Sequence, residues 1–193
     1  MTEKILILDF GSQYTQLIAR AVREANVYCE ITPFHQNIVF DPSLKGVILS
    51  GSPACYGAQL SAKNFGGKVE KSNKREYGRA QLRIQKQDIL FQNIPNNSQV
   101  WMSHSDSITQ LPSNFELLAD TDSIPVAAFR KKADGGNSLH GLQFHPEVYH
   151  STEGKKMIRN FLVEICGCKQ DWTPASFVNE TVEQLKGCCY LNS

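Results

Sequence analysis

The chain has 193 residues, of which 41% are hydrophobic and 20% are charged, enough to bury the core of one domain. Its 20 lysines and arginines are balanced by 19 aspartates and glutamates, which argues against nucleic acids or a membrane surface as partners, because both attract a strongly basic protein. No run approaches the roughly 18 apolar residues of a membrane span, and the first ten residues lack the layout of a signal peptide. We therefore expect a soluble, cytoplasmic, globular protein.

Six cysteines are scattered along the chain: Cys29, Cys55, Cys166, Cys168, Cys188 and Cys189. A chain of this size with an ordinary apolar fraction does not need disulfides to fold. Neither close pair has the C-x-x-C spacing of a zinc site, and no histidine lies near either pair at ligand spacing. We expect reduced thiols and no bound metal.

The first fifty residues indicate an α/β fold. Lys4–Leu8 is a short apolar run typical of a strand that is buried on both faces. After a turn in which Ser12 is placed to cap a helix, apolar residues in Gln13–Ala25 recur on one helical face. Val27–Ile31 and Gly46–Ser50 read as two further strands. Strand, helix and strand in this order predict parallel pairing.

The second half of the chain predicts short strands separated by Pro, Asn, Asp and Gly turns, followed by helices. A helix is expected around Met157–Ile165, ended by Gly167, and a last helix begins at Pro174. No repeat and no second domain is visible. We predict a mostly parallel central sheet with helices on both faces and a small antiparallel portion. The later strands are expected at Val100–Ser103, Phe115–Ala119, Val126–Arg130 and Leu139–Phe144.

Cys55 stands before a helix-compatible stretch that ends at Gly66 and Gly67. A cysteine at the N-terminus of a helix has a lowered pKa, because the helix dipole and the free N–H groups stabilise the thiolate. By itself this pattern is also compatible with a buried structural cysteine.

A second stretch ends a predicted strand with His145, Pro146 and Glu147. Pro146 forces a turn that returns Glu147 toward the imidazole. A cysteine nucleophile needs a base, and that base needs an orienting carboxylate, so this stretch supplies both partners. An ordinary strand end with a solvent-facing histidine is the alternative.

Taken together, these motifs resemble the class I (triad) glutamine amidotransferase family. The shared features are the C-Y-G-x-Q turn at Cys55, the F-H-P-E-V stretch at Phe144–Val148 and the G-S-P loop after the third strand. Within that family, three further stretches look like the glutaminase domains of GMP synthetases, and the resemblance extends to about Lys186. These stretches are Leu8–Tyr14, Arg75–Gly78 and Val100–Asp106.

The resemblance implies a triad in which Cys55 is the nucleophile, His145 is the general base and acid, and Glu147 orients His145. Thiolate attack on the side-chain amide of glutamine would give a thioester, which water hydrolyses to glutamate. The oxyanion hole would be formed by Gly51 and the N–H of Tyr56. The implied substrate-binding residues are Gln59, Ser103 and His104.

The resemblance also implies which domain of the whole enzyme carries out which reaction. Residues 1–186 form the glutaminase domain, 187–193 form a tail, and an ATP-pyrophosphatase or synthetase domain is absent from the chain. Ammonia would pass to that synthetase half, which aminates XMP to GMP with ATP and Mg²⁺, whereas the glutaminase domain itself holds no cofactor. The full enzyme is expected to be a homodimer.

One connection departs from the family pattern. Only Ser50–Ala54 separate the third predicted strand from Cys55, whereas the family places the nucleophile after its own buried parallel strand, with a glycine where this chain has Pro53. A parallel crossover needs a dozen or more residues. We therefore expect that a loop and a strand belong between residues 50 and 55 and are absent from this sequence, since a single domain would hardly survive the loss of a central strand.

Two other interpretations stay open. If the protein truly lacks that segment, it is an inactive amidotransferase-like docking or regulatory subunit. The nearest enzymatic alternative is the glutaminase of another triad amidotransferase, such as anthranilate synthase or carbamoyl-phosphate synthetase, against which the stretches Arg75–Gly78 and Trp101–His104 argue.

Overall fold

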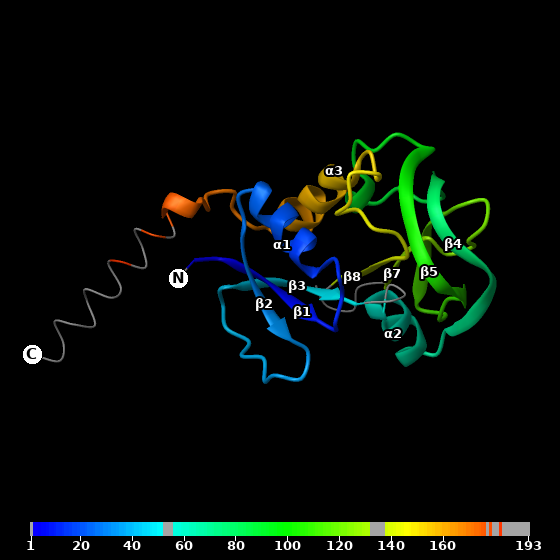
Figure 1. Cartoon of the computed structure of the whole chain (residues 1–193), viewed down its shortest axis with the longest axis horizontal. Helices are drawn as coiled ribbons and strands as arrows, with labels where there is room; N and C mark the ends of the chain where they lie inside the picture. The colour runs from blue at the N-terminus through cyan, green and yellow to red at the C-terminus, as the bar shows by residue number, and fades with distance from the viewer. Residues whose placement is uncertain (1, 52–55, 132–137, 177, 179–181, 183–193) are drawn as a thin grey trace, which may run out of the picture.

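The first three strands form a parallel sheet, as the sequence predicts (Figure 1). The computed structural model describes residues 2–51, 56–131, 138–176, 178 and 182. The sheet has the order β2-β1-β3, with both neighbours pairing in parallel to the central strand. Its elements are β1 (Lys4–Asp9), α1 (Thr15–Glu24), β2 (Tyr28–Pro33) and β3 (Leu44–Ser50).

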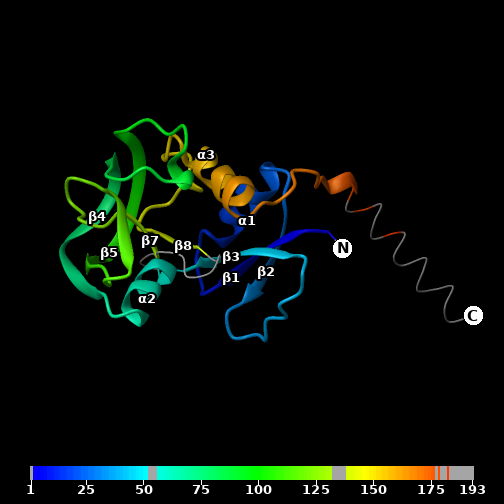
Figure 2. The ribbon, with the colours of Figure 1, turned by 180° about the vertical axis from the view of Figure 1, so that it is seen from behind.

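Helix α1 packs on this sheet because its apolar residues share one face. Ala19 and Val22 are fully buried and join Ile5 and Ile7 of β1 in one core cluster, which also contains Leu162. Figures 1 and 2 show α1 and α3 on the same side of the parallel sheet.

The turn between β1 and α1 is organised by Asp9. Its Oδ1 accepts hydrogen bonds from the N–H groups of Gly11 (2.9 Å) and Ser12 (3.2 Å) and from the hydroxyl of Thr15 (2.9 Å). Burial opposes ionisation, but these hydrogen bonds prevail and lower the pKa of Asp9. Ser12 was expected to cap the helix; the N-cap is Tyr14, and the Ser12 hydroxyl accepts from the Tyr14 N–H at 3.0 Å, just before the helix.

The remaining strands form an antiparallel sheet with the order β5-β4-β6-β7-β8. The α/β class is confirmed, but the antiparallel portion, expected to be small, has five strands. The long strand β4 was not predicted, and β5 extends well beyond the predicted Val100–Ser103. The bounds are α2 (Tyr56–Asn64), β4 (Lys68–Ile84), β5 (Ser98–Gln110), β6 (Phe115–Asp120), β7 (Ala128–Lys131) and β8 (Leu139–Leu142).

The predicted helix at Met157–Ile165 is present in two forms. Helix α3 (Gly154–Arg159) continues without interruption into a π-helical segment, η2 (Asn160–Ile165). Gly167, at φ +68°, ends it as predicted: its N–H donates to Val163 O and that of Cys168 donates to Leu162 O. Among the described residues, no helix is long and apolar enough to cross a membrane.

The last predicted helix begins where expected. Thr173 and Ser176 form a reciprocal capping pair: the N–H of Ser176 donates to Thr173 Oγ1 (3.0 Å), and the N–H of Thr173 donates to Ser176 Oγ (2.9 Å). Pro174 occupies the first turn, which suits its missing N–H. The boundary at residue 186 and the tail at 187–193 lie outside the described residues.

Asn160 gives a test of this architecture. Its buried Nδ2 donates to Leu90 O (3.1 Å) and Gln92 O (2.9 Å), joining η2 to the short turn η1 (Ile89–Phe91). We expect Asn160→Ala to lower the free energy of unfolding by about 2 kcal/mol, because two inward-facing carbonyls lose their donors. Denaturant unfolding measures this. Arg20→Ala, which removes only an exposed ion pair, is the control and should cost less than about 0.5 kcal/mol; equal losses would contradict the assignment.

Candidate functional site

His145 and Glu147 form a close pair just after β8. The Nδ1 of His145 lies 2.7 Å from Oε1 of Glu147, and the two side chains are only 10% and 3% exposed. The turn at Pro146 therefore returns the carboxylate to the imidazole, as the sequence predicts. With Nδ1 held by Glu147, proton transfer to or from another group takes place at Nε2.

The main chain of His145 is anchored on both sides. Its N–H donates to Trp101 O (3.0 Å), and its carbonyl accepts from the Ser151 hydroxyl (2.6 Å). The same hydroxyl oxygen accepts from the Trp101 N–H at 3.0 Å. One serine thus ties β5 to the turn that carries the histidine.

Tyr14 brings the first sheet to the pair. Its ring centroid lies 4.4 Å from that of His145. The same turn is bonded to the end of β3, because the Phe10 N–H donates to Ser50 O (2.9 Å) and the hydroxyls of Thr15 and Ser50 lie 2.9 Å apart. The carboxyl ends of β1 and β3 therefore meet the turn after β8.

The predicted oxyanion donors lie around the start of α2. Tyr56 is the first residue of α2, where main-chain N–H groups have no partner within the helix and suit a developing negative charge. Gly57 lets the helix approach β3, since a Cβ there would lie 2.6 Å from that of Leu49. Gly51 directly follows β3. Cys55 and the predicted break between residues 50 and 55 fall largely outside the described residues, so the nucleophile role stays a prediction.

Three predicted substrate-binding residues lie on α2 and β5. Gln59 is buried, and its amide nitrogen donates to Asp106 O at 2.9 Å, which fastens α2 to β5. His104 is fully buried, and Ser103 pairs with Tyr77 across the sheet. Their roles toward substrate stay predictions.

The cysteines within the described residues, Cys29, Cys166 and Cys168, are poor nucleophiles. Burial raises the pKa of the Cys166 thiol to about 12 and that of Cys168 to about 11, and it raises the pKa of Cys29. All three are free thiols. Within the described residues, no three His, Cys, Asp or Glu side chains converge as metal ligands would.

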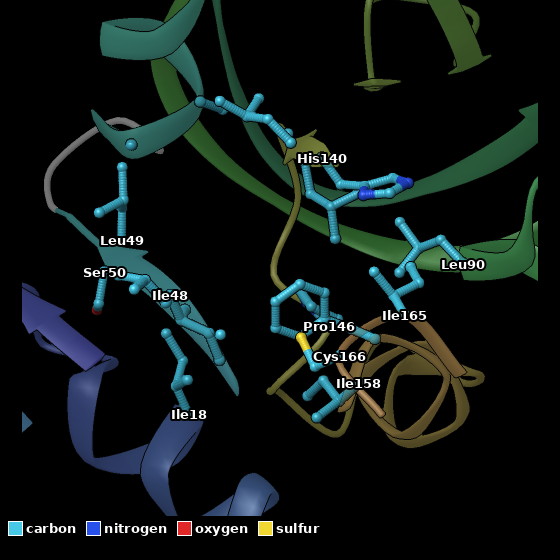
Figure 3. Close-up of a pocket in the computed structure, with 18 of the residues that line it drawn as sticks. Ile18, Ile48, Leu49, Ser50, Leu90, His140, Pro146, Ile158, Ile165 and Cys166 are labelled. Atoms are coloured by element: carbon cyan, nitrogen blue, oxygen red, sulfur yellow. The ribbon is translucent and has the colours of Figure 1, made fainter. Parts of the chain in front are cut away.

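A cavity of about 610 Å³ opens beside the pair (Figure 3). Its polar end contains Ser50, Gly51, His145 and Glu147. The rest is mainly apolar and extends between β3 and β8, with side chains such as Ile48, Leu142, Ile158 and Ile165 along its walls. Its polar end has the size and groups to admit a small amide substrate.

The family model described as Glutamine amidotransferase class-I matches residues 54–165, more than half of the chain. The chain belongs to the class-I glutamine amidotransferase family. It is 53% identical to the GMP synthase [glutamine-hydrolyzing] of Cytophaga hutchinsonii, covering 96% of the chain and 41% of that protein. It is 49% identical to GMP synthase [glutamine-hydrolyzing] 1 of Bacteroides thetaiotaomicron, with the same coverage. The chain thus spans about two fifths of these relatives.

Solved structures support the fold. A Thermoplasma acidophilum protein described as one of the subunits of a GMP synthase has a TM-score of 0.77 at 28% identity, covering 86% of this chain and 95% of that one. A Thermotoga maritima glutamine amidotransferase has a TM-score of 0.68 at 15% identity, covering 86% of this chain and 99% of that one, which supports the fold alone. The predicted class I amidotransferase fold is confirmed.

The structure adds two residues that sequence reasoning did not single out. Tyr14 packs on His145, and Ser151 holds its main chain. Tyr14 lies within the Leu8–Tyr14 stretch that carries the resemblance, so a signal existed. Ser151 gave none, because its role depends on a contact with Trp101, 50 residues away in sequence.

Gly154 tests the packing of the turn. A Cβ at Gly154 would overlap the carbonyl oxygen of Pro146. We expect Gly154→Ala to lower the free energy of unfolding by about 1–3 kcal/mol, as overpacking does, and to move Glu147 away from His145. Denaturant unfolding and the imidazole NMR signals of His145 measure the two effects. Lys155→Ala, at the exposed neighbouring position, should change neither; an unaltered Gly154→Ala protein would disprove the close approach.

Proposed function

We propose that this chain hydrolyses the side-chain amide of glutamine through a cysteine thioester and delivers the ammonia to a synthetase. The observation that carries the proposal is the buried His145–Glu147 pair at 2.7 Å, beside the N-terminus of α2 at one end of the cavity. Membership of the amidotransferase family supports it.

The chemistry follows from these groups. Cys55, directly before α2 in the sequence, attacks the amide carbonyl as a thiolate, with His145 accepting the thiol proton at Nε2. The N–H groups at Gly51 and Tyr56 stabilise the tetrahedral oxyanion. His145 then donates its proton to the departing ammonia and activates the water that releases glutamate. Glu147 keeps the imidazole in the required tautomer and stabilises its protonated form.

We propose, further, that the receiving half is a synthetase that aminates XMP to GMP with ATP and Mg²⁺. The names of the relatives support this, and the chain spans about two fifths of their length. The homodimer is a property proposed for that whole enzyme. The free thiols Cys29, Cys166 and Cys168 suit a reducing compartment, which supports a cytoplasmic location.

An inactive docking subunit is the second candidate. The alignment with the Cytophaga hutchinsonii relative covers 211 positions, more than the 193 residues of this chain, so the relative has residues without a counterpart here. If these include part of the active site, the chain would bind the synthetase without hydrolysing glutamine.

Substitutions at the pair test the catalytic role. We expect Cys55→Ala to abolish ammonia release from glutamine and His145→Ala to reduce it at least about a thousandfold. Glu147→Gln should cost less, because a poorly oriented imidazole still accepts protons part of the time. His35→Ala, in an exposed turn, is the control and should be unaffected. Wild-type release no faster than that of Cys55→Ala would favour the docking subunit.

Thiol labelling tests the identity of the nucleophile. In a Cys188→Ser, Cys189→Ser background, iodoacetamide at pH 8 should alkylate Cys55, and glutamine should slow the reaction. Cys166 should stay unlabelled, because a pKa of about 12 leaves only about one thiolate in ten thousand at that pH. Peptide mass spectrometry locates the label. Labelling of Cys29 or Cys168 at the rate of Cys55 would contradict the assignment.

A further inference from the structure

Asp9, Thr15 and Ser50 form a chain of buried hydrogen bonds beside the candidate site. The Thr15 hydroxyl donates to Asp9 Oδ1 at 2.9 Å, and the hydroxyls of Thr15 and Ser50 lie 2.9 Å apart. Thr15 and Ser50 are each only 2% exposed. Ser50 directly precedes Gly51, the proposed oxyanion donor. Because buried polar groups cost free energy unless they are hydrogen-bonded, such a chain holds its members in fixed positions.

The carboxylate of Asp9 determines the direction of the hydrogen bonds in this chain. Burial opposes ionisation, but the hydrogen bonds to Asp9 lower its pKa, so it is ionised at neutral pH and only accepts. The Thr15 hydroxyl has a single proton, for which the carboxylate is a closer acceptor than Ser12 O at 3.2 Å. Thr15 Oγ1 then accepts from the Ser50 hydroxyl. The chain therefore runs from Ser50 through Thr15 to Asp9.

The main chain of Ser50 is held by the same turn. Its carbonyl oxygen accepts from the Phe10 N–H at 2.9 Å, on the side of β3 that pairs with β1. The peptide group between Ser50 and Gly51 is planar, so its C=O and N–H point in opposite directions. The Gly51 N–H therefore points away from β1, toward the edge of β3 where both residues line the cavity with His145.

The Ser50 hydroxyl itself is turned away from the substrate. Figure 3 shows it directed toward the blue elements at the start of the chain, and its proton is donated to Thr15. Its effect on the reaction is therefore indirect, through the orientation of the peptide group that follows it.

We propose that Asp9 and Thr15 are positioning residues for the oxyanion hole: through the Ser50 hydroxyl, they fix the peptide group that presents the Gly51 N–H to the tetrahedral intermediate. This inference rests on the proposed glutamine hydrolysis and deepens it. An oxyanion donor is effective only where it is held about 3 Å from the position that the negative charge will occupy. Loss of one such donor costs roughly a hundredfold to a thousandfold in rate, and misplacement costs part of that.

Two substitutions of Thr15 test the proposal. Thr15→Val removes the hydroxyl with little change in shape, and Thr15→Ser keeps it. We expect Thr15→Val to lower kcat for ammonia release from glutamine about tenfold to a hundredfold and to leave KM within about twofold, because the oxyanion forms only during the reaction. Thr15→Ser should stay within about threefold of the wild type. An unchanged kcat in Thr15→Val would overturn the proposal.

Thr121 provides a matched control for the loss of a buried threonine hydroxyl. It is 3% exposed, its Oγ1 accepts from the Ile124 N–H at 3.1 Å, and it does not line the cavity. Thr121→Val should lower the unfolding temperature about as much as Thr15→Val and leave kcat unchanged. Equal losses of kcat in the two variants would show that reduced stability alone accounts for the effect, which would refute the positioning role.

Alkylation of Cys55 separates the oxyanion hole from the nucleophile. Iodoacetamide forms a carbon–sulfur bond with loss of iodide, so no oxyanion develops. In the Cys188→Ser, Cys189→Ser background, Thr15→Val should leave the rate of Cys55 alkylation within about twofold of the wild type. A fall in alkylation that matches the fall in hydrolysis would contradict the proposal, because the substitution would then have damaged the nucleophile.

A double-mutant cycle shows whether Thr15 acts through Ser50. Ser50→Ala alone should lower kcat at least about fivefold, and this variant tests the proposal even where Thr15→Val does not fold. The double variant should lose no more than the more damaged single variant, within about twofold, because both substitutions break one chain. Losses that multiply would mean that the two hydroxyls act independently and would disprove the chain.

Amide hydrogen exchange tests the positioning without reference to catalysis. The Phe10 N–H, which is bonded to Ser50 O, should exchange at least about tenfold faster in Thr15→Val than in the wild type or in Thr15→Ser. If the wild-type chain releases no ammonia, this faster exchange would count against the proposed hydrolysis and leave the positioning of Gly51 standing. Unchanged exchange would overturn the positioning whether or not the chain is active.

Discussion

The fixed main chain of His145 is the constraint on which the candidate site depends. An imidazole can serve as a base only if its ring is held in one orientation. Here hydrogen bonds hold both the main chain of the histidine and one nitrogen of its ring. The peptide groups of His145 are bonded to Trp101 and Ser151, and Nδ1 is bonded to Glu147. Gly154 permits this turn because its missing side chain leaves room for the Pro146 carbonyl. The histidine is thus positioned by β5, by the turn after β8 and by the start of α3, of which β5 is distant in sequence from the other two.

The parts of the fold that the sequence predicts are those that carry a strong local signal. The strands at Lys4–Asp9 and Leu44–Ser50 and helix α1 carry strong local signals, an apolar run or a 3.6-residue period, so their existence and order were predicted correctly. Strand β4 carries no such signal: Lys68–Ile84 is rich in charged residues, and its order comes from pairing with β5. The π-helical form of Asn160–Ile165 was likewise not visible, because an apolar period does not distinguish it from an α-helix.

The contacts of the candidate site likewise fall into local contacts, which the sequence predicts, and tertiary contacts, which it does not. The contact between His145 and Glu147 is local, two residues apart across a proline, and the sequence predicted it. Tyr14 and Ser151 act through tertiary contacts, which only the folded chain brings together. The prediction that Ser12 caps the helix was wrong, although its hydroxyl has the right chemistry. The donors of that turn instead bind Asp9, because its carboxylate accepts three hydrogen bonds at once.

The two sheets hold different parts of the candidate site. The acid–base pair is held by β5, by the turn after β8 and by α3, whereas the start of α2 with its N–H groups is positioned against the end of β3. The apolar cavity lies between these two halves. Three contacts join these halves: the Tyr14 ring packs on His145, the Gln59 amide donates to Asp106 O, and Leu162 packs into the core beneath the parallel sheet. The positions of the acid–base pair and of the N–H groups at the start of α2 are therefore fixed by packing and hydrogen bonds between the two sheets, which is the preorganisation that general acid–base catalysis requires.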